Sequence, residues 1–459
     1  MMKQDERVRE LSLPLPEDIL KRKWAGDIDG AIRAIDLRLE TELPDMLRYR
    51  LVTERERIRR LPTQYPWNRE QAIAKMQELA PKMTEADFDA LEMAGRIDFI
   101  YINGEKRYFV RFHRTIVKAA ELAHIHGRTV NPVSEWLDPM VDKIIARGEL
   151  AYRITIDAAL QLDEDAFEPG EYLAHLPFPA ETAQQSDVEL LAGDPDGMAA
   201  PQAHARTVWW RRRLDKWEDF RVRYAYTSRI RYADPLHQPA PAQPLYPNAR
   251  PVEAEDLMEQ EPYIRFTPYM RQLAADLAAG ETEPVRKAWK FYEFVTTKVK
   301  YSFMRDYFQI DDLGEYCAVN LKGDCGLQAL TFIILCRIAG IPARWQSGMS
   351  VEPDYVGSHD WAQFYLEGWG WLFADCSYGG GAYRCGSAKR HAFYFGNLCP
   401  MRMAANRTYQ AELEVPLEGL RVDPYDNQSG EIERIGAALP FTGRQTDCDA
   451  NLISMEEIE

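Results

Sequence analysis

The sequence predicts an α+β protein in three parts: a helical N-terminal region, a β-sandwich-like middle and a C-terminal domain with helices packed on an antiparallel sheet. Three observations lead to this prediction. Apolar residues recur at helical spacing over residues 15–95, short alternating runs fill residues 150–232, and a nearly all-apolar segment after residue 325 precedes further strand-like runs. At 459 residues the chain is too long for one ordinary core, so two or three domains are expected.

The N-terminal region, residues 1–145, is predicted to be helical and to end in a β-hairpin. Thr84 is a candidate helix N-cap, and two β-rich runs flank Asn103-Gly104, which accepts the positive φ angles of a type I′ turn. We interpret this helix-and-hairpin arrangement as a packing or interaction module and not as a DNA-binding one, because the chain is acidic and DNA repels negative charge. Four aliphatic side chains recur at steps of three or four residues: Ile28, Ile32, Ile35 and Leu39.

A β-sandwich-like domain is predicted over residues 146–234. Short alternating or β-branched runs such as AYRITIDAALQL and DFRVRYAYTSRIRYA are separated by Pro and Gly, which is typical of an antiparallel sandwich. A Pro-rich linker follows over residues 235–262, with six prolines between 235 and 251.

The C-terminal part, residues 263–459, reads as an α+β domain with a C-terminal extension. Two amphipathic helical segments come first, and Pro284 suits the first turn of the second. GLQALTFIILCRIAG is nearly all apolar and stops at Gly340, so it predicts a buried helix. ARWQSGMS, DWAQFYLEG and GWLFADCS then predict strands.

The charge balance excludes some classes of partner. The net charge is −16, and both nucleic acid and an anionic membrane need a cationic surface, so neither is an expected partner. No segment reaches about 18 uninterrupted apolar residues, and the first 18 residues contain no signal-peptide core, so we expect a cytoplasmic protein. The oligomeric state is not readable from the sequence.

The cysteines point to reduced thiols. Their number, seven, is odd, and five lie between residues 317 and 385, whereas a secreted disulfide framework would spread them in pairs. The sequence contains no CxxC spacing and no nearby pair of histidines, which are the patterns that would suggest a zinc site. No metal or other cofactor is therefore expected.

Cys325 is the candidate nucleophile. It lies where the buried helix is expected to begin, and unpaired N–H groups and the helix dipole there would stabilise a thiolate and lower the thiol pKa. Its own N–H could be the first donor of an oxyanion hole. The alternative, a cysteine acting as a small apolar residue, suits Cys336 deeper in the same helix. The flanking Gly323-Asp324 and Gly326 favour an exposed turn at Cys325.

His359 and Asp375 would complete a catalytic triad. His359 starts a strand and could take the thiol proton or pair with a thiolate. Asp375 closes an apolar strand, where a carboxylate is costly unless partnered, and orienting the histidine would satisfy it. A tight turn through Gly368 and Gly370 would bring the two residues opposite one another. Each residue alone has a structural explanation, so the prediction depends on their combination.

These motifs resemble the core of the transglutaminase-like superfamily. The resembling features are Gly323-Asp324-Cys325 at a helix start, the Gly-Ile-Pro-Ala-Arg end of that helix, His359-Asp360-Trp361, and Asp375 at the end of the next strand. The resemblance extends less sharply over residues 268–400. It implies a papain-like core with the order Cys, His, Asp. The preceding β-region is similar to that of bacterial members.

Three departures from the family limit what the resemblance implies. Cys376 directly follows the orienting aspartate and is expected to be buried. Nothing resembles the calcium-binding loops of animal transglutaminases. The zinc site of peptide N-glycanases, built from cysteine pairs, is also absent from the sequence.

The candidate substrate contacts are less specific. Aromatic side chains crowd the motifs, and most aromatics at strand spacing are core residues. Acidic residues such as Glu352 and Asp354 could bind a cationic or amine group of the substrate. The three glycines after Tyr378 predict either a mobile loop that gates the site or a plain surface turn. The substrate-contact candidates are Tyr301, Trp345, Asp360 and Trp361.

The predicted function is a cysteine-dependent hydrolase, a peptidase or amidase that acts on a peptide or other amide through a thioester. Transfer of the acyl group to an amine, as in a protein-glutamine transglutaminase, is the first alternative. A non-catalytic scaffold or binding protein with this fold is the second.

Overall fold

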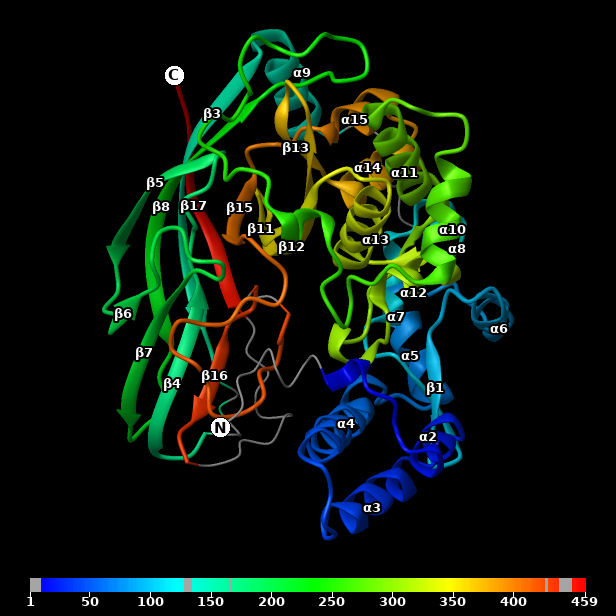
Figure 1. Ribbon diagram of the computed structural model, residues 1–459. Coiled ribbons are helices and arrows are strands. Elements are labelled where there is room, and N and C mark those ends of the chain that lie inside the picture. Colours follow the sequence, from blue (N-terminus) through cyan, green and yellow to red (C-terminus); the bar gives the residue numbers. More distant parts are fainter. Residues whose placement is uncertain (1–9, 128–133, 163, 165–166, 426–427, 437–447) are drawn as a thin grey trace.

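The computed structural model describes residues 10–127, 134–162, 164, 167–425, 428–436 and 448–459. Figure 1 shows blue helices of the N-terminal region, a β-rich part that includes the red C-terminal strand, and a second sheet with helices coloured green to orange. The predicted α+β class is confirmed, including the N-terminal helical region and the β-sandwich. The first nine residues, part of the segment where no signal peptide is expected, lie outside the described ranges.

The N-terminal region follows its local sequence signals. Thr84 caps its helix, accepting a hydrogen bond from the Asp87 N–H, while the Asp87 side chain accepts from the Thr84 N–H. Asn103 and Gly104 have φ angles of 50° and 88° and form the predicted two-residue hairpin turn. The elements are η1 (Glu10–Ser12), α2 (Glu17–Trp24), α3 (Ile28–Leu39), α4 (Asp45–Gln64), α5 (Arg69–Leu79), α6 (Glu85–Met93), β1 (Phe99–Ile102), β2 (Glu105–Tyr108), α7 (Phe112–Lys118), η2 (Ala120–Leu122) and α8 (Ala123–His126).

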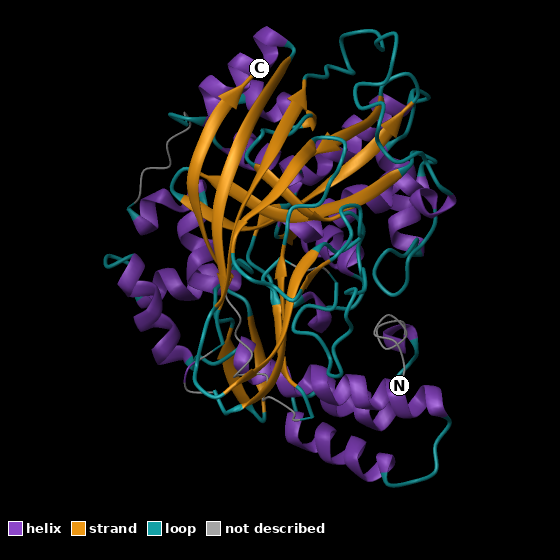
Figure 2. Ribbon diagram, turned by 90° about the vertical axis from the view of Figure 1, so that its left-hand side faces the viewer, coloured by secondary structure: helices purple, strands orange, loops and turns teal. Residues whose placement is uncertain are grey.

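Two four-stranded antiparallel sheets form the sandwich, in the orders β16-β4-β7-β6 and β17-β3-β8-β5 (Figure 2). Trp210 of one sheet packs on Phe220 of the other, with ring centroids 5.4 Å apart. Strands β16 and β17 come from the C-terminal end of the chain, so the sandwich is not closed by residues 146–234 alone; the predicted domain boundaries remain predictions. The elements are α9 (Leu137–Arg147), β3 (Glu149–Leu160), β4 (Gly170–Pro177), β5 (Gln185–Ala192), β6 (Gly197–Met198), β7 (Thr207–Leu214), β8 (Phe220–Arg231), β16 (Glu431–Arg434) and β17 (Cys448–Ile458).

The remaining sheet has the order β14-β13-β12-β11-β15 and is antiparallel. The buried helix α13 packs on it, with the Phe332 and Phe364 rings 5.6 Å apart, and ends as predicted before Gly340. The elements are η4 (Ala254–Leu257), α10 (Pro268–Leu277), α11 (Pro284–Lys298), β9 (Lys300–Tyr301), η5 (Tyr307–Gln309), α12 (Leu313–Asn320), β10 (Lys322–Gly323), α13 (Cys325–Ile338), β11 (Ala343–Glu352), β12 (Tyr355–Leu366), β13 (Gly370–Ala374), α14 (Cys376–Arg384), α15 (Ala388–Phe393), β14 (Phe395–Gly396) and β15 (Arg402–Asn406).

The glycine-rich segment after Asp375 is a helix, α14, and the prediction of a gating loop or surface turn is wrong. Its glycines allow close packing. A Cβ atom on Gly379 would lie 1.8 Å from the Tyr292 hydroxyl of α11, and one on Gly380 would lie 3.2 Å from the Thr296 carbonyl oxygen. The lost helix propensity of glycine is therefore offset by the approach of two helices.

None of the helices in the described ranges has the length and apolar character that a membrane crossing requires.

Candidate active site

Cys325 is the first residue of α13, as predicted. The preceding residue, Asp324, caps the helix by accepting a hydrogen bond from the Leu327 N–H, 3.3 Å away. The Tyr307 hydroxyl donates to the same Asp324 oxygen over 2.6 Å. Strands β9 and β10 pair in parallel, with Gly323 opposite Tyr301, and so hold the segment that leads into Cys325.

The start of α13 leaves backbone donors available. Within the described part of the chain, the N–H groups of Cys325 and Gly326 have no hydrogen-bond acceptor. Gly326 is required here for steric reasons, because a Cβ atom would lie 2.1 Å from the Tyr307 hydroxyl. These two N–H groups can hold a negatively charged oxygen beside the thiol.

The thiol of Cys325 donates a hydrogen bond to Asp360 Oδ2, with a sulfur–oxygen distance of 3.2 Å. Burial, and then the charges of Asp360 and Asp324, hold the pKa of Cys325 well above its usual range. This direction is opposite to the one that the helix N-terminus alone predicts. Burial and the two neighbouring carboxylates together outweigh the helix dipole, so the thiol is protonated in this arrangement.

His359 and Asp375 are adjacent in the structure. His359 lies in β12, and its Nε2 is 2.9 Å from Asp375 Oδ2. Asp375 is the N-cap of α14 and accepts from the Tyr378 N–H over 3.0 Å. Strand β13 pairs with β12 so that Ala374 is opposite Ala362, which brings Asp375 within reach of a histidine three residues from that pair.

Arg402 is the neighbour that the sequence analysis missed. It extends from β15, is 1% exposed, and donates to Asp375 Oδ2 from Nε and from a terminal nitrogen, over 3.2 and 3.1 Å. Burial would raise the pKa of Asp375, but the charges of His359 and Arg402 outweigh it and lower that pKa. Asp375 is therefore ionised, and it fixes the orientation of the imidazole.

Burial lowers the pKa of His359, and the positive charge of Arg402 acts in the same direction against the opposing effect of Asp375. The ring is consequently neutral near pH 7. Its second nitrogen, Nδ1, makes no hydrogen bond with any residue that the structure describes. This atom is free to accept a proton.

The structure does not join Cys325 directly to His359: within the described ranges no hydrogen bond links the two side chains. The residue of β12 that contacts the thiol is instead Asp360, which follows His359 in the chain. The side chain of Gln428 adds a bridge from the C-terminal region, because its Nε2 donates both to the His359 carbonyl oxygen and to Asp360 Oδ1. Sequence reasoning missed Gln428 as well.

Of the residues predicted to contact substrate, some lie at the candidate active site and others lie in the hydrophobic core. Trp345 and Trp361 are 2% and 0% exposed, and the Trp361 indole N–H donates to Gln346 Oε1, so neither indole is accessible to a substrate here. Tyr301 is partly buried, and burial, followed by the charge of Cys325, raises its pKa; its backbone pairs with Gly323, two residues before the thiol. Asp360 contacts the thiol directly.

The remaining sequence candidates lie in different surroundings. Glu352 accepts hydrogen bonds from Ser350 and Tyr378, whereas Asp354 is exposed in the turn between β11 and β12. Cys376 is 1% exposed, which agrees with the expectation that it is buried. In the described part of the chain, no three His, Cys, Asp or Glu side chains form a group suited to a metal ion.

Comparison with known proteins identifies the class of this core. Residues 271–376 match the family model of the transglutaminase-like superfamily, and this segment contains Cys325, His359 and Asp375. The resemblance that the sequence motifs indicated is therefore confirmed: this segment of the chain belongs to the transglutaminase-like superfamily. No curated protein matches the chain.

Several solved structures are distantly similar. A putative cysteine protease from Cytophaga hutchinsonii has 13% identity and a TM-score of 0.39, covering 68% of this chain and 90% of its own. The periplasmic domain of TgpA from Pseudomonas aeruginosa has 16% identity and a TM-score of 0.28, covering 55% and 95%. A putative protease from Parabacteroides distasonis has 11% identity and a TM-score of 0.24, covering 48% and 42%.

Proposed function

We propose that the protein is a cysteine-dependent hydrolase of amide bonds, a peptidase or amidase, with Cys325 as nucleophile. The observation that carries this proposal is the imidazole of His359, which is oriented through Nε2 by the ionised Asp375, while Asp360, the next residue of β12, contacts the thiol of Cys325 at the start of α13. A neutral, oriented imidazole is the group that general-base activation of a thiol requires.

The reaction would begin with a change of hydrogen bond at the thiol. Cys325 exchanges its bond to Asp360 for one to Nδ1 of His359, which takes the proton as sulfur attacks the carbonyl carbon. The developing oxyanion is held by the N–H groups of Cys325 and Gly326. The His359 imidazolium then protonates the leaving amine, and the C–N bond breaks to leave a thioester on Cys325.

Hydrolysis would complete the cycle. His359 removes a proton from water, the hydroxide attacks the thioester, and the thiolate leaves and is reprotonated by His359. Asp375 stabilises the imidazolium stages, and Arg402 helps to keep this aspartate ionised. Cys325 is only partly buried, so water has access to the thioester, which favours hydrolysis over amine transfer.

An assay with a glutamine-containing peptide and a labelled primary amine distinguishes the outcomes. Hydrolysis predicts release of ammonia, or of a shorter peptide, with little label on the acyl group. Stable incorporation of the amine that outpaces hydrolysis would instead identify a transglutaminase. If neither product forms and Cys325→Ala behaves as the wild type, the chain is a non-catalytic scaffold.

We also propose a cytoplasmic location, on the grounds of the reduced cysteines expected from the sequence. Fractionation of the producing cells with markers for each compartment tests it. Recovery of the protein with a periplasmic or secreted marker would contradict it.

A further inference from the structure

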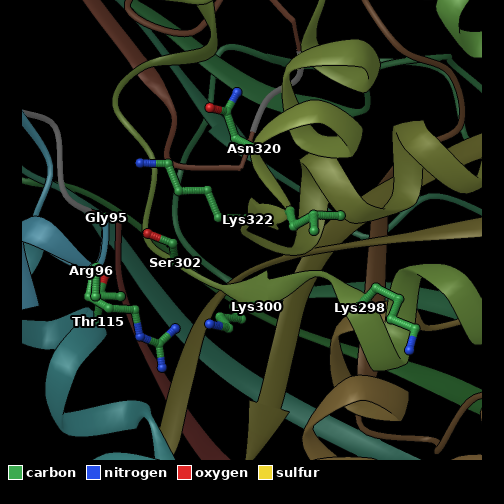
Figure 3. Close-up of a pocket in the computed structure, with 10 residues that line it drawn as sticks. Gly95, Arg96, Thr115, Lys298, Lys300, Ser302, Asn320 and Lys322 are labelled. Carbon is green, nitrogen blue, oxygen red and sulfur yellow. The ribbon is translucent and has the colours of Figure 1, made fainter.

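A cationic cavity lies between the N-terminal helical region and the transglutaminase-like core. Its volume is about 220 Å³. Arg96 and Thr115 line it from the N-terminal region, and Lys298, Lys300, Ser302 and Lys322 line it from the core (Figure 3). It is therefore built by two parts of the chain that are about 200 residues apart in sequence.

The charge of this cavity is opposite to that of the whole chain. Four of its lining side chains are basic and none is acidic, whereas the protein carries a net charge of −16. Arg96 pairs with Glu121, and Lys322 pairs with Asp98 at 3.4 Å.

Two of the four basic side chains remain without a counterion. Lys298 and Lys300 form no ion pair within the described ranges, and both are exposed. In Figure 3 the Lys300 ammonium group points toward Arg96. Figure 3 shows the Lys298 side chain directed away from Ser302 and Asn320, so Lys300 supplies the unneutralised ammonium group that faces the rest of the cavity, and Lys298 adds positive charge at its rim. This arrangement suits the binding of an anion.

A short segment of chain connects the cavity lining to the nucleophile. Lys300 and Lys322 lie in the paired strands β9 and β10, and Lys322 precedes Cys325 by three residues. Successive residues of a strand point to opposite sides, so Lys300, which lines the cavity, and Tyr301 point to opposite sides of β9.

Helix α7 extends the positive charge toward the thiol. The Phe303 N–H donates to Thr115 Oγ1 over 3.0 Å, which seats α7 on the segment after β9. One helical turn further on, the Lys118 Nζ lies 5.2 Å from the centroid of the Tyr301 ring. Burial lowers the pKa of Lys118, while the charges of Cys325 and Glu352 act in the opposite direction. Lys118 is therefore close enough to the active site to interact with it.

We propose that this cavity, together with Lys118, binds the carboxylates of an acidic peptide segment adjoining the bond that Cys325 attacks. The inference rests on the proposed peptidase function and specifies its substrate class. Three residues of extended chain span about 10 Å. An aspartate or glutamate about three residues from the attacked bond would thus reach the cavity, and the same chain would pass Lys118.

The test separates binding from catalysis. Full-length Cys325→Ala protein is titrated into a fluorescein-labelled peptide of Glu-Gly repeats, and into its Gln-Gly counterpart, with fluorescence anisotropy as the readout. We expect the acidic peptide to bind roughly tenfold more tightly at low salt, with the difference shrinking at physiological ionic strength.

Adding Lys298→Ala and Lys300→Ala should remove most of that difference. Both side chains are exposed, so the fold should tolerate the changes. Lys287→Ala on the same helix is the matched control, because it lies about 16 Å along α11 from Lys298. Equal binding of the two peptides, or unchanged binding by the double-lysine variant, would overturn the inference.

Digestion of a peptide library by the wild type, read by mass spectrometry, is the second arm. Enrichment of Asp and Glu near the cleavage sites supports the inference, and cleavage without that enrichment overturns it. If nothing is cleaved but the acidic peptide binds through the lysines, the proposed peptidase function fails while the anion site stands.

Discussion

The contact between Cys325 and Asp360 leads to a quantitative prediction about the thiol. Asp360→Asn removes a negative charge whose oxygen is 3.2 Å from the sulfur and keeps an oxygen that can accept from Gln428. A charge at this distance changes a pKa by about 1 to 3. The pKa of Cys325 should fall by that amount in the variant, although burial will still hold it above that of an exposed thiol.

The expected change in reactivity follows from two opposing effects. At a pH below both pKa values, each drop of one in pKa raises the thiolate fraction tenfold. The nucleophilicity of a thiolate falls with its pKa, with a Brønsted coefficient of about 0.4–0.5. Alkylation of Cys325 should therefore become roughly 3- to 60-fold faster at neutral pH.

The assay is iodoacetamide labelling of Cys325 as a function of pH, quantified by peptide mass spectrometry. Asp354→Asn is the matched control, because Asp354 is exposed in the turn of the same hairpin. The midpoint of the pH–rate curve should move to lower pH only for Asp360→Asn. A midpoint that stays the same in that variant would refute the argument that Asp360 holds the thiol protonated.

Three further variants test other features of the structure. Arg402→Met leaves Asp375 buried without its guanidinium, so the free energy of unfolding from urea titration should fall by about 3–5 kcal/mol; a loss below about 1 kcal/mol would contradict the ion pair. Burial raises the pKa of Asp306 to about 6, so the folded state binds this proton more tightly than the unfolded state and stability falls as the pH rises from 3.8 to about 6. Asp306→Asn should consequently stabilise the protein at pH 8, by up to about 3 kcal/mol, and not at pH 4; an equal effect at both pH values in chemical denaturation would show that the charge is not responsible. Gly326→Ala places a Cβ atom 2.1 Å from the Tyr307 hydroxyl, so we expect a loss of about 1–3 kcal/mol and a lower melting temperature, and an unchanged melting curve would refute this packing constraint.

Local patterns in the sequence predicted the elements that carry the site. The apolar run before Gly340 predicted the buried helix α13, and the alternating runs after it predicted β11, β12 and β13. A polar residue at the end of an apolar element needs a partner, and this reasoning led to Asp375. These inferences succeeded because each depends on residues that are neighbours in sequence.

Contacts between distant segments were not predictable from such patterns. Arg402 and Gln428 reach the site from residues 27 and 68 positions beyond Asp375 and Asp360, and no periodicity marks either residue. The pairing of β17 with β3 likewise joins segments that are about 300 residues apart in sequence. The glycines of α14 looked like a loop because their packing against Tyr292 depends on another helix.

The central claim is that Cys325 forms an acyl-enzyme with the help of His359, and an active ester tests it most directly. Mixing the protein with excess p-nitrophenyl acetate should release a burst of p-nitrophenol close to one equivalent, with one hydroxylamine-sensitive acetyl group on Cys325 in the intact and peptide masses. Cys325→Ala should abolish the burst, and His359→Ala should slow both formation and loss of the acetyl group. A burst of the same size in Cys325→Ala, or an acetyl group on another residue, would contradict the account.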